Sequence, residues 1–199
     1  MLDRRHFLGA VVGSTVVFSG AQAQIVEKAT AFVQQTGNQL VAVVNGAMAP
    51  ADKRRALTQI LEAAVDVDGI ARFCLGRFWR TASPDQQKRF MAAFHEVLVT
   101  NISSKLGEYR GVKLTVQRGR QQDDEAIVTT IVDRPNNPPS TVDWVIEQPA
   151  TAPKIIDVVA EGTSLRLTQR QDYASYLARN NNDVDALINA MKHQTAQSG

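Results

Sequence analysis

The segment KIIDVVAEGTSL, at residues 154–165, changes its hydrophobic pattern twice. Residues 155–160 are apolar apart from Asp157, which predicts a strand that other elements cover on both faces. Gly162 predicts a tight turn, because glycine adopts turn conformations at no steric cost. From Leu165 onward apolar residues recur at helical spacing. The segment therefore predicts a fold in which the last strand of a sheet leads directly into a helix.

Helical periodicity dominates the chain before the sheet, over residues 24–106. A first helix is expected to stop at Gly46, and Pro50 is expected to open a second. The third segment, 66–79, contains two glycines that are expected to interrupt it. The sequence SPDQ at 83–86 supplies a serine cap, a proline at the first helical position and a glutamine that reaches back to the cap. It predicts the start of a long amphipathic helix.

Alternation of period two begins at Val112 and predicts β-strands. The polar turn at 121–124 joins the first two strands as a hairpin, and the proline-rich turn at 134–139 leads to the next. This third strand places three apolar side chains on one face: Val142, Trp144 and Ile146. The strand at 155–160 is the fourth. An antiparallel meander of about four strands is therefore expected.

Two helices are expected after the sheet, at 165–178 and after Asn182, followed by a frayed polar tail from His193. Helices, then a meander, then helices predict the α+β class, with the sheet cupped by N- and C-terminal helices. The number of apolar residues is large for a sheet that has only one obvious covering layer of helices. We therefore expect an apolar cavity between the strand face that carries Trp144 and the helices that carry three phenylalanines: Phe73, Phe90 and Phe94.

Residues 1–23 have the layout of an export signal. Paired arginines at 4–5 precede a short apolar run at 8–18, and an Ala-x-Ala cleavage site ends at Ala23. The arginine pair favours a twin-arginine signal, with an ordinary Sec signal as the alternative. We therefore expect a twin-arginine-like signal peptide at 1–23, a periplasmic location, and a single domain at 24–199.

The formal net charge of the chain is +2. Loss of the export signal removes Asp3, Arg4 and Arg5, one net positive charge, so +2 falls to +1. A nearly neutral protein lacks the electrostatic attraction that nucleic acid binding requires. The sole cysteine, Cys74, lies among apolar residues and predicts a buried, inert thiol. No spacing of histidines and cysteines indicates a metal site, and no cofactor is expected.

Several segments form a set by their order and spacing: LGRFWR at 75–80 followed by SP at 83–84, the helix 87–98, YRG at 109–111, VDWV at 142–145, and IDVVAEGTSL at 156–165. Together they resemble the MlaC-type periplasmic phospholipid carriers, also called toluene-tolerance auxiliary proteins. The resemblance implies a shuttle that passes phospholipid between an outer-membrane lipoprotein complex and an inner-membrane ABC transporter, and so maintains outer-membrane lipid asymmetry. A related branch is associated with hopanoids, which leaves the lipid species open.

A carrier of this kind would hold two acyl tails in an apolar pocket and leave the headgroup in water. We predict that its lipid-binding residues come from both layers: Phe73, Phe90, Phe94, Leu98, Ile131, Val142, Trp144, Ile146, Val158 and Tyr173. Three arginines near Trp79 are predicted to contact a partner complex or a headgroup phosphate: Arg72, Arg77 and Arg80. A solvated face is the alternative interpretation of these arginines.

An acid inside an apolar strand must be paired or neutral, so Asp157 is expected to pair with a cation. Arg170 is the predicted partner, and a catalytic base is the alternative. Two further classes of function stay open beside the carrier, which is not an enzyme. One is a small cavity enzyme of isomerase type that would use Asp157. The other is a periplasmic adaptor with a solid core.

Overall fold

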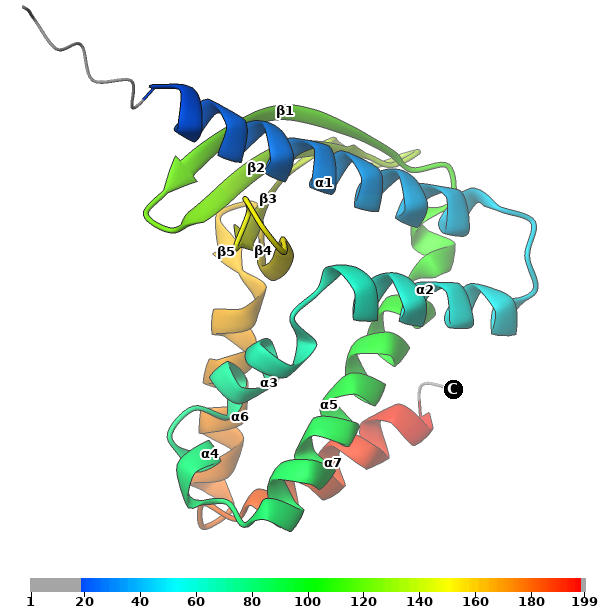
Figure 1. Cartoon of the computed structure of the whole chain (residues 1–199). Helices are drawn as coiled ribbons and strands as arrows, with labels where there is room; N and C mark the ends of the chain where they lie inside the picture. Colours follow the sequence, from blue (N-terminus) through cyan, green and yellow to red (C-terminus); the bar gives the residue numbers. More distant parts are fainter. Residues whose placement is uncertain (1–18, 198–199) are drawn as a thin grey trace, which may run out of the picture.

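The computed structural model describes residues 19–197 (Figure 1). Helices come first, an antiparallel sheet follows, and two helices complete the chain, which confirms the α+β class. The elements are α1 (Ser19–Asn45), α2 (Pro50–Ala64), α3 (Val67–Leu75), α4 (Phe78–Thr81), α5 (Pro84–Ser104), η1 (Leu106–Tyr109), β1 (Lys113–Gln122), β2 (Glu125–Asp133), β3 (Ser140–Glu147), β4 (Lys154–Ala160), β5 (Thr163–Ser164), α6 (Leu165–Arg179) and α7 (Val184–Gln197).

The five strands lie in the order β1-β2-β3-β4-β5, and every neighbouring pair is antiparallel. The sequence predicts about four strands. The additional strand, β5, has two residues and folds back onto the end of β4 through a turn at Glu161 and Gly162. Both turn residues have positive φ, 51° and 81°. This is the turn that the glycine predicts, and α6 begins directly after it.

Helix α1 lies across one face of the sheet (Figure 1). The contact is close at Gly119 in β1, where an added Cβ would lie 2.7 Å from the side chains of Val26 and Thr30 in α1. Beneath the helix, Val128 and Ile146 are fully buried. We call the buried set between α1, the end of α2 and the sheet the sheet cluster: Ala29, Val33, Ala64, Ala126, Val128, Ile146 and Ile155.

Helices α3 to α7 form a second body below the sheet (Figure 1). Its interior is built around the apolar face of α5, the helix that the SPDQ sequence opens. We call this interior the bundle cluster; its larger buried members are Leu75, Phe90, Phe94, Val97, Tyr173, Leu177, Leu187, Ile188 and Met191. The SPDQ prediction is confirmed, because Ser83 and Gln86 exchange both hydrogen bonds of a capping box, at 3.1 and 3.0 Å.

The two bodies meet along β4. The backbone N–H of Asp66 donates to the carbonyl of Ile155 at 3.0 Å, and Val65 forms a parallel bridge with the same residue. Lys154 Nζ donates to the last carbonyls of α2, among them that of Glu62 at 3.1 Å. Val65 packs against both the sheet cluster and the bundle cluster. The chain between α2 and α3 is therefore held on the strand that joins the two bodies.

Two local expectations differ from the structure. Gly69 does not interrupt a helix but lies in the first turn of α3, because its N–H donates to the capping carboxylate of Asp66 at 3.0 Å. Gly76 does end α3, with φ +60°. The tail predicted from His193 belongs to α7, which continues to Gln197. Residues 1–18 of the expected signal peptide lie outside the described residues, and the expected cleavage point after residue 23 falls within α1.

Candidate ligand-binding site

The predicted lipid-binding residues divide between the two bodies. Phe90, Phe94 and Tyr173 are buried in the bundle cluster, and two others pack against it while partly exposed: Phe73 and Leu98. Ile146 belongs to the sheet cluster, against which two half-buried residues pack: Trp144 and Val158. The set therefore comes from both the sheet and the helices, as the sequence predicts. Its role in lipid binding stays a prediction.

The sequence predicts an apolar cavity between the sheet face of Trp144 and the helices that carry the phenylalanines. In the structure other elements cover that face. The sheet face that carries Trp144 and Ile146 is covered by α1 and the end of α2. Phe90 and Phe94 instead pack against Tyr173 of α6. The prediction that these phenylalanines face that strand surface is wrong, because period-two alternation identifies a strand face without identifying the helix that covers it.

Two of the predicted lipid-binding residues, Val142 and Ile131, lie on opposite faces of the sheet. Val142 pairs with Thr130 and lies on the same sheet face as Trp144, where it is half-buried. Ile131 follows Thr130 along β2, so it lies on the opposite face. Ile131 and Val142 therefore line opposite faces of the sheet, and their role in lipid binding stays a prediction.

The bundle cluster contains a polar atom that is unusual for its surroundings. The hydroxyl of Tyr173 is buried and has no hydrogen-bond partner among the described residues. Its ring meets Phe90 and Phe94 edge-on, with centroid distances of 5.9 and 6.4 Å. Burial raises the pKa of Tyr173 well above its usual range. A buried, unpartnered hydroxyl destabilises its surroundings by about 1–3 kcal/mol, so this interior is not packed as favourably as an apolar core.

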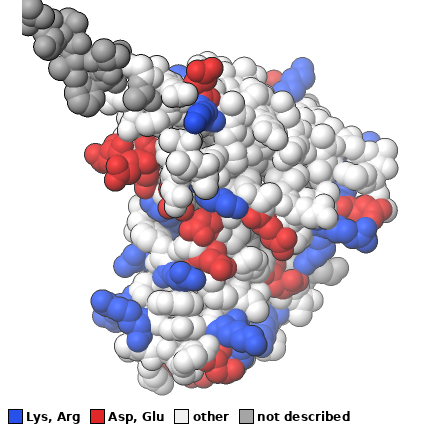
Figure 2. Space-filling model, in the orientation of Figure 1, with Lys and Arg blue, Asp and Glu red and all other residues white. Residues whose placement is uncertain are grey.

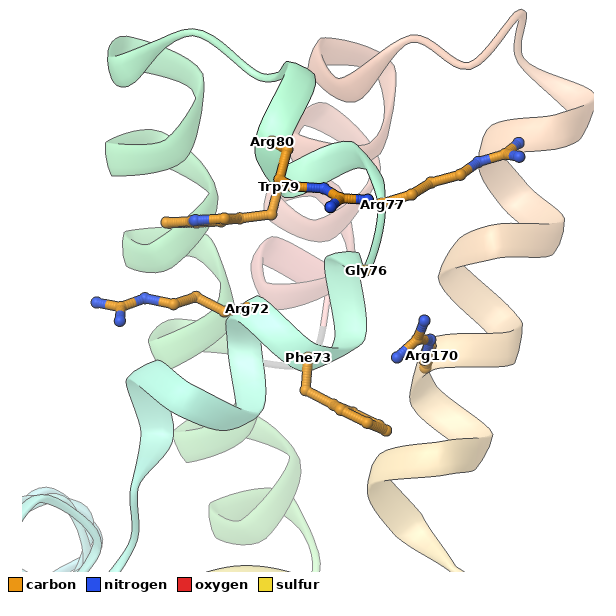
Figure 3. Close-up of a pocket in the computed structure, with 7 residues that line it drawn as sticks. All are labelled: Arg72, Phe73, Gly76, Arg77, Trp79, Arg80 and Arg170. Carbon is orange, nitrogen blue, oxygen red and sulfur yellow. The ribbon is translucent and has the colours of Figure 1, made fainter.

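A pocket of about 330 Å³ lies where α3, α4 and α6 meet (Figure 3). All three arginines of the predicted partner or headgroup patch line it: Arg72, Arg77 and Arg80. A fourth arginine, Arg170 of α6, also lines it, and Figure 3 shows Arg72 and Trp79 pointing to one side of the pocket while Arg170 lies on the other, beside Phe73. Phe73 and Trp79 complete the walls. Figure 2 shows basic side chains gathered around the end of the molecule that carries α4.

The sequence predicts a different contact for Arg170, an ion pair with Asp157. The prediction that it pairs with Asp157 is wrong, because Arg166 is the partner, with its Nε 3.5 Å from Oδ2 of the carboxylate. Asp157 is 6 % exposed and also accepts hydrogen bonds from the Ser164 hydroxyl at 2.5 Å and from the backbone N–H groups of Val158 and Arg166, at 2.8 and 3.1 Å. This carboxylate therefore fastens the first turn of α6 to β4.

The other titratable candidates have ordinary structural surroundings. Burial raises the pKa of the Cys74 thiol to about 12, and the side chain is 2 % exposed, which confirms the predicted buried thiol. His95 lies 3.2 Å from the carboxylate of Asp68. Asp143 lies on the sheet face opposite Trp144 and accepts a hydrogen bond from the Thr129 hydroxyl at 2.6 Å.

Within residues 19–197, no three His, Cys, Asp or Glu side chains are grouped so as to hold a metal ion. The same residues include no helix that is both long and apolar enough to cross a membrane.

Comparison with known proteins gives consistent matches. The family model described as "MlaC protein" matches residues 34–193. The toluene tolerance protein ttg2D of Pseudomonas putida is 28 % identical over 145 residues, which cover 72 % of this chain and 67 % of that protein. A phospholipid-binding protein of Ralstonia solanacearum, solved in complex with a phospholipid, has the same fold, with a TM-score of 0.72 and 22 % identity. That match covers 85 % of this chain and 98 % of the other.

Proposed function

The chain belongs to the MlaC family, and we propose that it is a periplasmic carrier that binds phospholipid by its acyl tails and transports it. The observation that carries the proposal is the shared fold with a protein whose solved structure holds a phospholipid. The relative from Pseudomonas putida, by its name, acts in toluene tolerance. Solvent tolerance depends on the state of the membrane, which is consistent with lipid transport.

We place the acyl tails where the sheet cluster and the bundle cluster meet, beside Val65. The bundle side is the more adaptable wall, because it contains the unpartnered hydroxyl of Tyr173 and two half-exposed apolar side chains, Phe73 and Leu98. The sheet side contributes Trp144 and Val158, which are only partly buried. Tails that separate the two bodies would contact residues from both groups of the predicted lipid-binding set.

The energetics of a carrier favour such an adaptable interior. Each methylene that leaves water gains about 0.8 kcal/mol, so two acyl chains gain on the order of 20 kcal/mol or more. A bilayer offers the tails nearly the same gain. The carrier must therefore match a membrane rather than exceed it, and it needs apolar walls that separate without a large penalty. No catalytic group takes part, since neither step makes or breaks a covalent bond.

Membership of the family supports a proposal for the shuttle partners. We propose that the protein receives or delivers phospholipid at an outer-membrane lipoprotein complex and at an inner-membrane ABC transporter, and so supports outer-membrane lipid asymmetry. Export by the segment at residues 1–23, through the Tat or Sec route, would place it between the two membranes. Hopanoid is the alternative cargo, because its rigid apolar body suits the same walls.

Lipid uptake from vesicles tests the carrier function. Lipid-free protein is mixed with vesicles that contain a fluorescent phospholipid, separated by size, and analysed for bound lipid. We expect about one phospholipid for each protein molecule. Vesicles with labelled hopanoid, in a parallel arm, assign the cargo. Failure to take up either lipid, combined with turnover of a small-molecule substrate that depends on Asp157, would favour an enzyme of isomerase type instead.

A further inference from the structure

The arginine pocket has four cations and no acidic residue among the described residues that line it. None of the guanidinium groups of Arg72, Arg77, Arg80 and Arg170 takes part in an ion pair with a described carboxylate within 4.0 Å. Other arginines of the chain do find acids: Arg54 pairs with Glu96, for example, at 2.6 Å. Four like charges around one hollow repel one another, so the pocket favours an anion.

Aromatic rings rather than acids hold these guanidinium groups in place. The guanidinium carbon of Arg170 lies 4.7 Å from the ring centroid of Phe73, and that of Arg72 lies 5.5 Å from the ring of Trp79. Arg77 lies over Phe78 at 4.8 Å. An arginine held by its flat face keeps its N–H donors at the edge, where they are free to bind a ligand. Three of the four groups are therefore oriented and still available.

The backbone at Gly76 permits the approach of Arg170. Gly76 ends α3 with φ +60° and ψ −129°, a conformation that residues with a Cβ rarely adopt. A Cβ at this position would lie 3.4 Å from Nε and Nη2 of Arg170. The glycine thus lets the chain turn from α3 to α4 and leaves room for a guanidinium from α6 beside it. Residues far apart in sequence are brought to one hollow by this turn.

We propose that this pocket is a binding site for the phosphate group of a phospholipid headgroup. A phosphate ester offers several acceptor oxygens in a compact anion, which suits a hollow lined by guanidinium groups from α3, from the segment 77–80 and from α6. Phe73 links the site to the interior, because its ring packs on the bundle cluster while carrying the guanidinium groups of Arg166 and Arg170. The bound phosphate belongs either to the carried lipid or to a lipid of the membrane surface.

Trp79 provides a direct readout, because it lines the pocket. Lipid-free protein is titrated with inorganic phosphate at constant ionic strength, with chloride as the reference anion, and tryptophan emission is recorded. We expect a saturable change that is absent from Trp79→Phe, whose remaining tryptophan lies in the sheet body. Arg77→Gln/Arg170→Gln should weaken the apparent affinity about tenfold or more, since hydrogen bonds between charged groups are lost.

The matched control removes two exposed arginines elsewhere, in Arg118→Gln/Arg179→Gln, and should leave the affinity within about twofold. Circular dichroism of both double variants establishes that the fold is kept. No saturable response to phosphate, or an equal loss of affinity in the control, would overturn the site. Lipid carriage is measured separately by uptake from vesicles. A protein that carries lipid but ignores phosphate refutes only the site, and one that binds phosphate without carrying lipid refutes only the carrier function.

A second arm identifies the source of the phosphate, which alone depends on the proposed carrier function. The same titration is run on protein that holds a bound phospholipid. If the carried headgroup occupies the pocket, inorganic phosphate gives no further response. If the response equals that of lipid-free protein, the pocket is open while lipid is carried and takes its phosphate from a membrane surface. Each result supports the site and assigns its ligand.

Discussion

The sheet body and the helical body solve the same packing problem with different side chains. The sheet cluster consists of alanine, valine and isoleucine, and its central residues Val128 and Ile146 are fully buried. The bundle cluster is built around an aromatic group of Phe90, Phe94 and Tyr173 and contains an unpartnered hydroxyl. In the first interior the buried hydroxyl beside the cluster, that of Thr130, is hydrogen-bonded, since it donates to the carbonyl of Val142 and accepts from the indole N–H of Trp144. In the second interior the unpartnered hydroxyl makes the packed state less favourable, which lowers the cost of opening it. We therefore regard the sheet body as the fixed wall and the helical body as the wall that moves.

The largest expected effect breaks the fixed wall. Ile146→Glu places a charge in the sheet cluster among alanine, valine and isoleucine side chains, and an unpaired buried charge costs several kcal/mol, here about 5 kcal/mol or more. Thermal unfolding followed by circular dichroism should show loss of the native fold. Thr141→Glu, an exposed position on the same strand, is the control and should be neutral. A folded, cooperative Ile146→Glu protein would mean that the sheet body is the adaptable one.

The joint between the bodies is the second target. Asp157→Asn removes the charge that pairs with Arg166, and breaking a buried pair costs about 3 kcal/mol or more. We expect a lower unfolding temperature with lipid uptake retained by the folded fraction. Asp143→Asn, a half-exposed acid of the adjacent strand, should cost much less. A stable Asp157→Asn variant that no longer acts on a substrate would instead support the isomerase reading.

Two tyrosines of the helical body differ in whether their hydroxyl group has a hydrogen-bond partner among the described residues. Tyr173→Phe removes a hydroxyl without a partner and should leave stability unchanged or raise it by about 1 kcal/mol. Tyr176→Phe removes a hydroxyl that donates to the carbonyl of Ala186 at 3.4 Å and should lower stability by about 0.5–1 kcal/mol. Chemical denaturation measures both. If both variants lose stability equally, the Tyr173 hydroxyl is satisfied in solution and the bundle interior is not frustrated.

The smallest expected effect concerns the surface of the helical body. Asp185 accepts a hydrogen bond from Gln86 at 2.9 Å and pairs with Arg89 at 2.7 Å, and these contacts lower its pKa below the ordinary 3.8. A lowered pKa stabilises the fold above pH 3.8, and this contribution is lost as the pH falls through the folded-state pKa. Asp185→Asn should therefore reduce the unfolding temperature slightly at neutral pH and not in strong acid. Asp124→Asn, in the exposed β1–β2 turn, should show no such pattern.

Local signals in the sequence were sufficient for most of the elements. The helix start at Ser83 and Pro84 was predicted because a capping box uses only neighbouring residues. Strand alternation likewise predicted β1 to β3, and the apolar run at residues 155–160 predicted β4. The two-residue strand β5 was missed, since two residues carry no period. Gly69 was misread because its role depends on the Asp66 side chain rather than on its own flexibility.

The site was harder to predict because it depends on which surfaces meet. Arg72, Arg77 and Arg80 were grouped correctly, since they lie within one short segment. Arg170 was assigned to Asp157 because it lies near that residue in sequence. In the structure Arg166 takes this place, and one helical turn of about 5.4 Å carries Arg170 beyond it to Phe73. The spacing of Arg166 and Arg170 by four residues was the signal that one helix face carries both cations.

The proposed carrier function requires that the protein holds a phospholipid in the periplasm. Native mass spectrometry of the protein purified from the periplasm, without detergent, tests it most directly. We expect a mass above that of the processed chain by one phospholipid, which organic extraction removes and identifies. A lipid-free mass in protein that is folded and freshly prepared from the periplasm would contradict the claim.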